Sequence, residues 1–105
     1  MKSKRQEELE AFLADDPNDP FLHYALALEY QKAGENDEYQ FRLEWLVQEH
    51  QGYLATYYQL GKCYETTNKI KEASDIFKRG MALAELQKNK NTFNELKSAL
   101  EELDL

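Results

Sequence analysis

The most restrictive feature of this sequence is its similarity to itself at a spacing of 34 residues. A shift by that distance lays Tyr24 on Tyr58, Leu26 on Leu60, Tyr30 on Tyr64 and Glu38 on Glu72. A fixed period of this length is typical of helical repeat proteins, in which each small unit buries its apolar face against its neighbours. The sequence therefore predicts a chain built from copies of one helical unit.

The spacing of apolar residues predicts that all the regular structure is helical. Apolar residues recur three and four positions apart, and no stretch shows the alternation expected of a strand. Pro17 is expected to end a first helix, while Asp19 and Pro20 suit the cap and the first turn of the next. The class is therefore all-α.

Turn residues divide the rest of the chain into helix pairs. Helices are predicted from about 20 to 33, 36 to 50, 54 to 67 and 70 to 86, with Gly34 and Asn68 as left-handed turn residues within the two pairs. A last helix is predicted over residues 92–103, where Thr92 and Glu95 have the spacing of a capping box. Its apolar residues lie on one side, as expected of a helix that closes a stack.

The stretch YYQLGKCYETTNKIKEASDIFKRG, which begins at Tyr57, resembles a tetratricopeptide repeat. The signature places of that repeat are occupied by Leu60, Gly61, Tyr64, Ala73 and Phe77. The preceding unit is a weaker copy that keeps Leu26, Ala27, Tyr30 and Leu43 but has Tyr39 where the pattern has alanine.

The resemblance implies an α-α superhelix, a right-handed stack of antiparallel helix pairs in one domain over residues 1–105. It divides that domain into a half-repeat helix at 4–16, a first repeat at 20–53, a second at 54–87 and a capping helix at 92–103.

Charge and composition exclude several classes of partner. The net charge is −7, and both nucleic acid and anionic lipid require a basic surface. Residues 1–53 carry five basic and twelve acidic side chains, whereas residues 54–105 carry eight of each. No apolar run reaches the length of a membrane span, and no apolar stretch follows the basic start MKSKRQEELE. We expect a cytoplasmic protein without nucleic-acid or membrane binding.

No constellation of residues predicts catalysis, a metal or a cofactor. Gly61 and Lys62 lack the earlier glycines and the following Ser or Thr of a phosphate loop. Cys63 has no base beside it in the sequence and is expected to be structural, so Cys63→Ser should leave binding intact. His23 is expected to be a satisfied residue at the edge of the core rather than a ligand, and His50 lies near a helix end.

The helix over residues 20–33 is more apolar than its packing requires. Its core stripe contains Leu26 and Ala27, yet Phe21, Tyr24 and Leu28 form a second stripe on the opposite side. In tetratricopeptide proteins this side lines a concave groove that holds ligands, and the resemblance extends the groove to Tyr58 and Lys62. Either the groove is open, or the amino-terminal residues or a second copy cover it.

A second apolar pair lies on the helix over residues 36–50. Phe41 and Trp45 are one turn apart and are expected to point away from the core face. Their equivalents in the next repeat are Asp75 and Arg79, so the repeat itself does not require aromatic residues there. They are a possible interface on the convex side, the alternative being a pair partly covered by Arg42 and Glu44.

The resemblance also indicates what the groove accepts. Chaperone-docking members of the family hold a peptide carboxylate with Lys and Asn side chains, at places that correspond here to Tyr24, Leu28 and Gln59. None of these supplies a positive charge, so the expected ligand is an apolar or aromatic peptide or helix of another protein. The expected function is a non-enzymatic adaptor; the alternative is a structural homodimer that buries these surfaces against a second copy.

Overall fold

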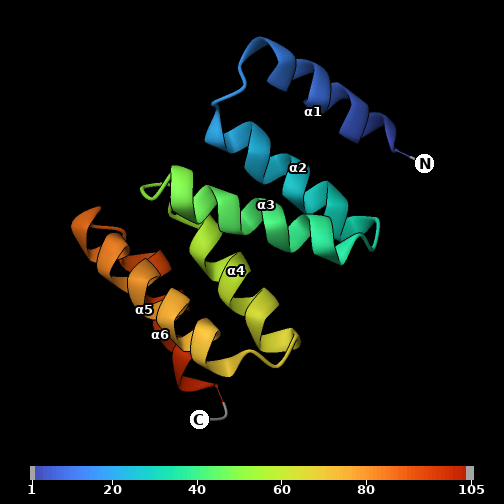
Figure 1. Cartoon of the computed structure of the whole chain (residues 1–105). Helices are drawn as coiled ribbons and strands as arrows, with labels where there is room; N and C mark the ends of the chain where they lie inside the picture. Colours follow the sequence, from blue (N-terminus) through green and yellow to red (C-terminus); the bar gives the residue numbers. More distant parts are fainter. Residues whose placement is uncertain (1, 104–105) are drawn as a thin grey trace. The chain divides into compact units, whose positions relative to one another are not determined.

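The computed structural model describes residues 2–103 and contains six α-helices and no strand in that range (Figure 1). The helices are α1 (Lys4–Asp15), α2 (Pro20–Lys32), α3 (Asn36–Glu49), α4 (Ala55–Thr66), α5 (Ile70–Leu86) and α6 (Lys90–Glu101). The prediction of an all-α class is confirmed. The predicted domain over residues 1–105 extends beyond the described residues at both ends.

Side-chain caps define the starts of the first two helices. The Ser3 hydroxyl accepts from the Gln6 backbone N–H at 3.1 Å, and the Gln6 side chain accepts from the Ser3 N–H at 2.8 Å. These two bonds form a capping box and satisfy donors that a helix start leaves without intrahelical partners. Before α2, Asp19 accepts from the Phe21 N–H at 2.9 Å and Pro20 is the first helical residue, as the sequence predicts.

Three of the helix ends share one backbone arrangement. Gly34, Asn68 and Lys88 have positive φ angles of 78°, 63° and 58° and follow α2, α4 and α5. In each case this residue donates its N–H to the carbonyl three residues earlier, and the next residue donates to the carbonyl five residues earlier. These paired bonds satisfy the last carbonyls of the helix and reverse the chain tightly. The sequence predicts Gly34 and Asn68 in this role but not Lys88.

The described helices fall into two compact units, divided between Gln51 and Gly52. In the first unit α2 packs against both α1 and α3 (Figure 1). Tyr39, which replaces the small residue of the repeat pattern, is only 4% exposed, so the second helix of this pair accommodates the larger ring. The buried core of this unit consists of Leu9, Leu26, Ala27, Tyr39, Leu43, Leu46 and Val47.

The second unit is organised by two glycines on its packed faces. A Cβ atom at Gly61 of α4 would overlap three ring carbons of Phe77 on α5, and that ring is fully buried. A Cβ at Gly80 of α5 would lie 2.7 Å from the Tyr57 Cβ and 2.9 Å from the Leu96 Cδ1 on α6. The absence of a side chain at these two places lets α4, α5 and α6 approach closely.

The start of the last helix differs from the prediction. Thr92 and Glu95 do not form the expected capping box, because α6 begins at Lys90 and its cap is Asn89. The Asn89 side-chain oxygen accepts from the Thr92 backbone N–H at 3.0 Å. The expectation is wrong because Asn is as good a cap as Thr, and the reversal at Lys88 places Asn89 at the start of the helix.

The packing at Gly61 can be tested with two alanine substitutions. We expect Gly61→Ala to lower the free energy of unfolding by about 1 to 3 kcal/mol through overpacking against Phe77, which outweighs the gain of about 1 kcal/mol in helix propensity. Gly52→Ala is the control, since no heavy atom lies within 4 Å of its Cβ position. Urea denaturation measures both; a Gly61→Ala protein as stable as the wild type would contradict this packing.

The cap of α6 can be tested in the same way. Asn89→Ala should lower the free energy of unfolding by about 1 kcal/mol, because the Thr92 N–H loses its acceptor. Thr92→Ala should change it by less than about 0.5 kcal/mol, since the Thr92 hydroxyl does not cap the helix. If Thr92→Ala lost more stability than Asn89→Ala in thermal or urea denaturation, Thr92 rather than Asn89 would be the cap of α6.

Candidate functional site

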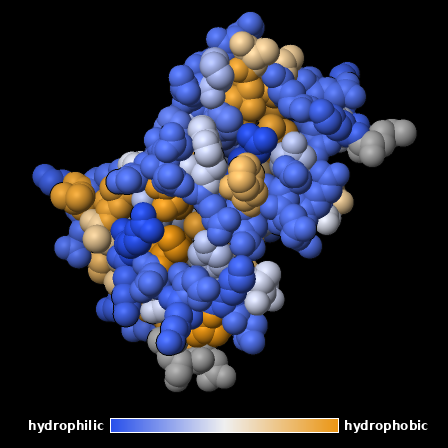
Figure 2. Space-filling view, viewed as in Figure 1, coloured by the Kyte–Doolittle hydropathy of each residue, from blue (hydrophilic) through white to orange (hydrophobic). Residues whose placement is uncertain are grey.

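The predicted ligand-facing residues of α2 lie opposite its buried face. Leu26 and Ala27 are 1% and 0% exposed, whereas the Phe21 side chain is 55% exposed and Tyr24 and Leu28 are partly buried. The helix therefore carries apolar side chains at the surface as well as in the core. Figure 2 shows apolar areas at the surface of both units, each surrounded by hydrophilic residues.

Tyr58 and Lys62, the two predicted residues of α4, belong to the second unit and are both partly buried. The Tyr58 ring lies 6.4 Å from the Phe77 ring, measured between centroids, at an angle of 45°. The Lys62 Nζ lies 3.0 Å from the Glu65 Oε1 one turn later. The hydrogen bond to the Glu65 carboxylate raises the pKa of Lys62, while burial acts in the opposite direction. The charge of Lys62 is thus already paired within its own helix.

The outward aromatic residues of α3 line a small pocket between α2 and α3. Its volume is about 260 Å³, and its walls are His23, Phe41, Arg42 and Trp45. Phe41 is 65% exposed, as expected of an outward residue. Trp45 is partly covered: its ring centroid lies 4.3 Å from that of His23 and 5.5 Å from that of His50.

Hydrogen bonds fix the tautomer of His23. Its Nε2 lies 2.7 Å from the Pro17 carbonyl oxygen, which only accepts, so Nε2 carries the proton. Nδ1 is therefore the acceptor for the Arg42 Nη1, at 2.9 Å. His23 is satisfied at both ring nitrogens, which agrees with its predicted role at the edge of the core.

Arg42 is held on two sides but forms no ion pair with a described residue. Besides its bond to His23, its guanidinium lies 5.6 Å from the centroid of the Tyr30 ring, within the range of a cation–π contact. Its Nε is buried without an acceptor, and among the described residues no carboxylate lies within ion-pair distance. The sequence did not reveal this arrangement, because it depends on the register of α2 against α3.

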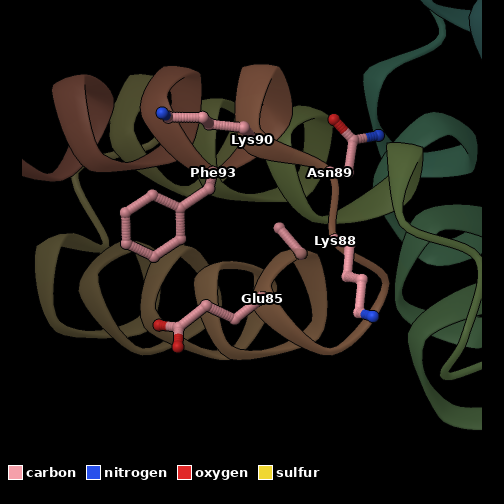
Figure 3. Close-up of a pocket in the computed structure, with 6 residues that line it drawn as sticks. Glu85, Lys88, Asn89, Lys90 and Phe93 are labelled. Atoms are coloured by element: carbon pink, nitrogen blue, oxygen red, sulfur yellow. The ribbon is translucent and has the colours of Figure 1, made fainter.

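A second pocket, of about 330 Å³, lies at the turn between α5 and α6. Figure 3 shows the Phe93 ring between the two helices, with Glu85 on the α5 side and Lys90 on the α6 side. Ala84, Lys88 and Asn89 complete its walls. The Phe93 ring is partly exposed.

The described residues hold no other arrangement that predicts chemistry. No group of three or more His, Cys, Asp or Glu side chains in residues 2–103 is placed to hold a metal ion. Gly61 is buried in the middle of α4, which does not suit a phosphate loop, and Cys63 on the same helix is partly buried and forms no disulfide with a described residue. None of the described helices is long and apolar enough to cross a membrane.

Solved structures identify the family. A crystal structure of a tetratricopeptide repeat domain protein from Salinibacter ruber is 33% identical over 80% of this chain and 93% of that chain, with a TM-score of 0.77. A solution NMR structure of a tetratricopeptide repeat domain protein from the same organism is also 33% identical, over 84% and 89% of the two chains, with a TM-score of 0.80. This chain belongs to the tetratricopeptide repeat family. No family model matches the sequence, and no curated protein matches it.

The family assignment agrees with the burial of the signature residues in the second unit. Leu60, Ala73 and Phe77 are at most 1% exposed, and Gly61 is buried against the Phe77 ring. The fold is an all-α helical repeat. Tetratricopeptide repeats are typically non-enzymatic modules for protein–protein interaction, and membership supports such a role in general terms.

Proposed function

We propose that this tetratricopeptide protein is a non-enzymatic adaptor that binds an apolar or aromatic peptide segment or helix of another protein. Phe21, Tyr24 and Leu28 on α2 are the proposed principal contacts in the first unit, and Tyr58 and Lys62 on α4 are proposed contacts of the second unit. The observation that carries the proposal is the exposure of Phe21, at 55%, on a helix that buries Leu26 and Ala27 on its other face. An apolar side chain that the core does not use is available to a partner.

The ion pair between Lys62 and Glu65 supports an apolar ligand rather than an acidic one. The ammonium group is already paired with Glu65 at 3.0 Å, so a ligand carboxylate would have to compete with a carboxylate on the same helix. Exposed ion pairs contribute at most about 1 kcal/mol, whereas truncation of an aromatic anchor in a desolvated contact typically costs about 2 kcal/mol or more. We therefore assign the main part of the binding energy to the aromatic residues of α2.

A peptide library displayed on phage tests this function. The selected peptides should be rich in aromatic and large aliphatic residues, and titration calorimetry should show that Tyr24→Ala and Phe21→Ala each weaken binding by about 2 kcal/mol. Lys62→Ala is the matched control and should weaken it by less than about 1 kcal/mol. Circular dichroism checks that all variants are folded.

Two results would contradict the proposal. If Lys62→Ala abolished binding and Tyr24→Ala left it unchanged, the surface would recognise charge. If light scattering showed a dimer at all concentrations and no peptide were selected, the alternative of a structural homodimer would be favoured, since the same apolar residues would be buried against a second copy.

A further inference from the structure

The pocket between α2 and α3 has the size of a site for one side chain. Its volume of about 260 Å³ is below the range of about 300 to 1,000 Å³ that is usual for whole small molecules and cofactors. Phe41 and Trp45 provide apolar walls, and Phe41 is largely exposed on the solvent side. These walls suit an aromatic ring, because edge-to-face and offset contacts between aromatic rings are energetically favourable.

Arg42 gives the pocket one oriented cation. The bond from Nη1 to His23 and the contact with the Tyr30 ring fix the plane of the guanidinium, so little side-chain entropy remains to be lost when a ligand binds. Nε and Nη2 have no acceptor among the described residues, and because Nε is buried, Nη2 is the nitrogen that remains for a ligand. Nη2 can donate one charge-assisted hydrogen bond to a carboxylate in the pocket.

The surroundings limit the charge of the ligand. Residues 1–53 carry seven more acidic than basic side chains, and Glu38 and Glu44 lie on α3 within one turn of Arg42. These groups would repel a run of acidic residues in a ligand. The charge of a single carboxylate bound to Arg42 is instead compensated by the guanidinium. The charge complementarity therefore favours one acid.

We propose that the pocket of His23, Phe41, Arg42 and Trp45 binds a peptide segment of another protein in which a single carboxylate adjoins an aromatic side chain. The carboxylate accepts from the Nη2 of Arg42, and the aromatic ring packs against Phe41 and Trp45. His23 is a positioning residue, because it orients Arg42 through its Nδ1. This site is separate from the proposed ligand contacts Phe21, Tyr24 and Leu28, so either proposal can fail without the other.

Matched short peptides test the site on the unmodified protein. Trp45 is the only tryptophan, so its indole N–H resonance in a ¹H–¹⁵N NMR spectrum reports on this pocket alone. Acetyl-Glu-Phe-amide should shift this resonance in a saturable way at millimolar concentrations. Acetyl-Gln-Phe-amide, which has the same shape without the charge, and acetyl-Glu-Ala-amide, which lacks the ring, should each bind about tenfold more weakly.

Two arginine variants separate the pocket from general charge effects. Arg42→Gln should reduce the affinity for acetyl-Glu-Phe-amide about tenfold. Arg79→Gln should leave it unchanged, although Arg79 also lies over a tyrosine ring, at 5.9 Å from that of Tyr57. Thermal melting confirms that both variants are folded, and the peptide comparison on the wild type does not depend on either.

Three outcomes would overturn the proposal. Equal affinities for the Glu and Gln peptides would show that Arg42 does not bind the carboxylate. Shifts that do not saturate would show that there is no site. A Trp45 resonance that moves with protein concentration alone, together with a dimer in light scattering, would assign the pocket to a second copy of this chain.

Discussion

The second unit depends on the contact between Gly61 and the ring of Phe77. The ring is fully buried and occupies the space that any side chain at position 61 would need, so α4 and α5 lie as close as their backbones allow. Gly80 of α5 is packed in the same way against Tyr57 of α4 and Leu96 of α6. Close packing of this kind favours burial of the helix face that carries the glycine, because neighbouring helices can approach closely only there.

Once the buried faces are fixed, the remaining apolar side chains need another explanation. On α2 the core uses Leu26 and Ala27, and Phe21 remains at the surface. On α3 the core uses Leu43, Leu46 and Val47, and Phe41 remains at the surface. Exposed rings do not stabilise a fold, and two of them on adjacent helices are consistent with a module that binds other proteins. The two surfaces differ in chemistry, since the one on α3 has beside its ring a cation, Arg42, that forms no ion pair with a described residue.

Most of the fold could be predicted from the sequence, because its signals are local. The 34-residue period, the Asp19 cap and the turn residues Gly34 and Asn68 need no knowledge of tertiary contacts. The turn at Lys88 could not be predicted, because lysine has no preference for a left-handed conformation and backbone bonds at the helix end compensate for its cost. The missed cap at Asn89 follows from the same turn.

The candidate sites were only partly predictable, for a physical reason. Apolar residues opposite a core stripe, such as Tyr24 and Phe41, can be recognised from helical periodicity in one segment. The association of His23 with Arg42 joins residues on two helices, and it requires their relative rotation to be known. The absence of a carboxylate partner for Arg42 is a property of the folded surroundings and leaves no mark in a single sequence.

We propose that the exposed rings of Phe21 and Phe41 serve binding rather than folding. It is tested most directly by the free energy of unfolding of the double variant Phe21→Gln/Phe41→Gln, measured by urea denaturation over a range of protein concentrations. The free energy of unfolding of this variant should lie within about 1 kcal/mol of that of the wild type, since surface substitutions usually change stability by about 0.5 kcal/mol or less each. A loss of more than about 2 kcal/mol would contradict it, because buried apolar side chains lose that much on truncation, and would show that these rings are covered in the folded protein.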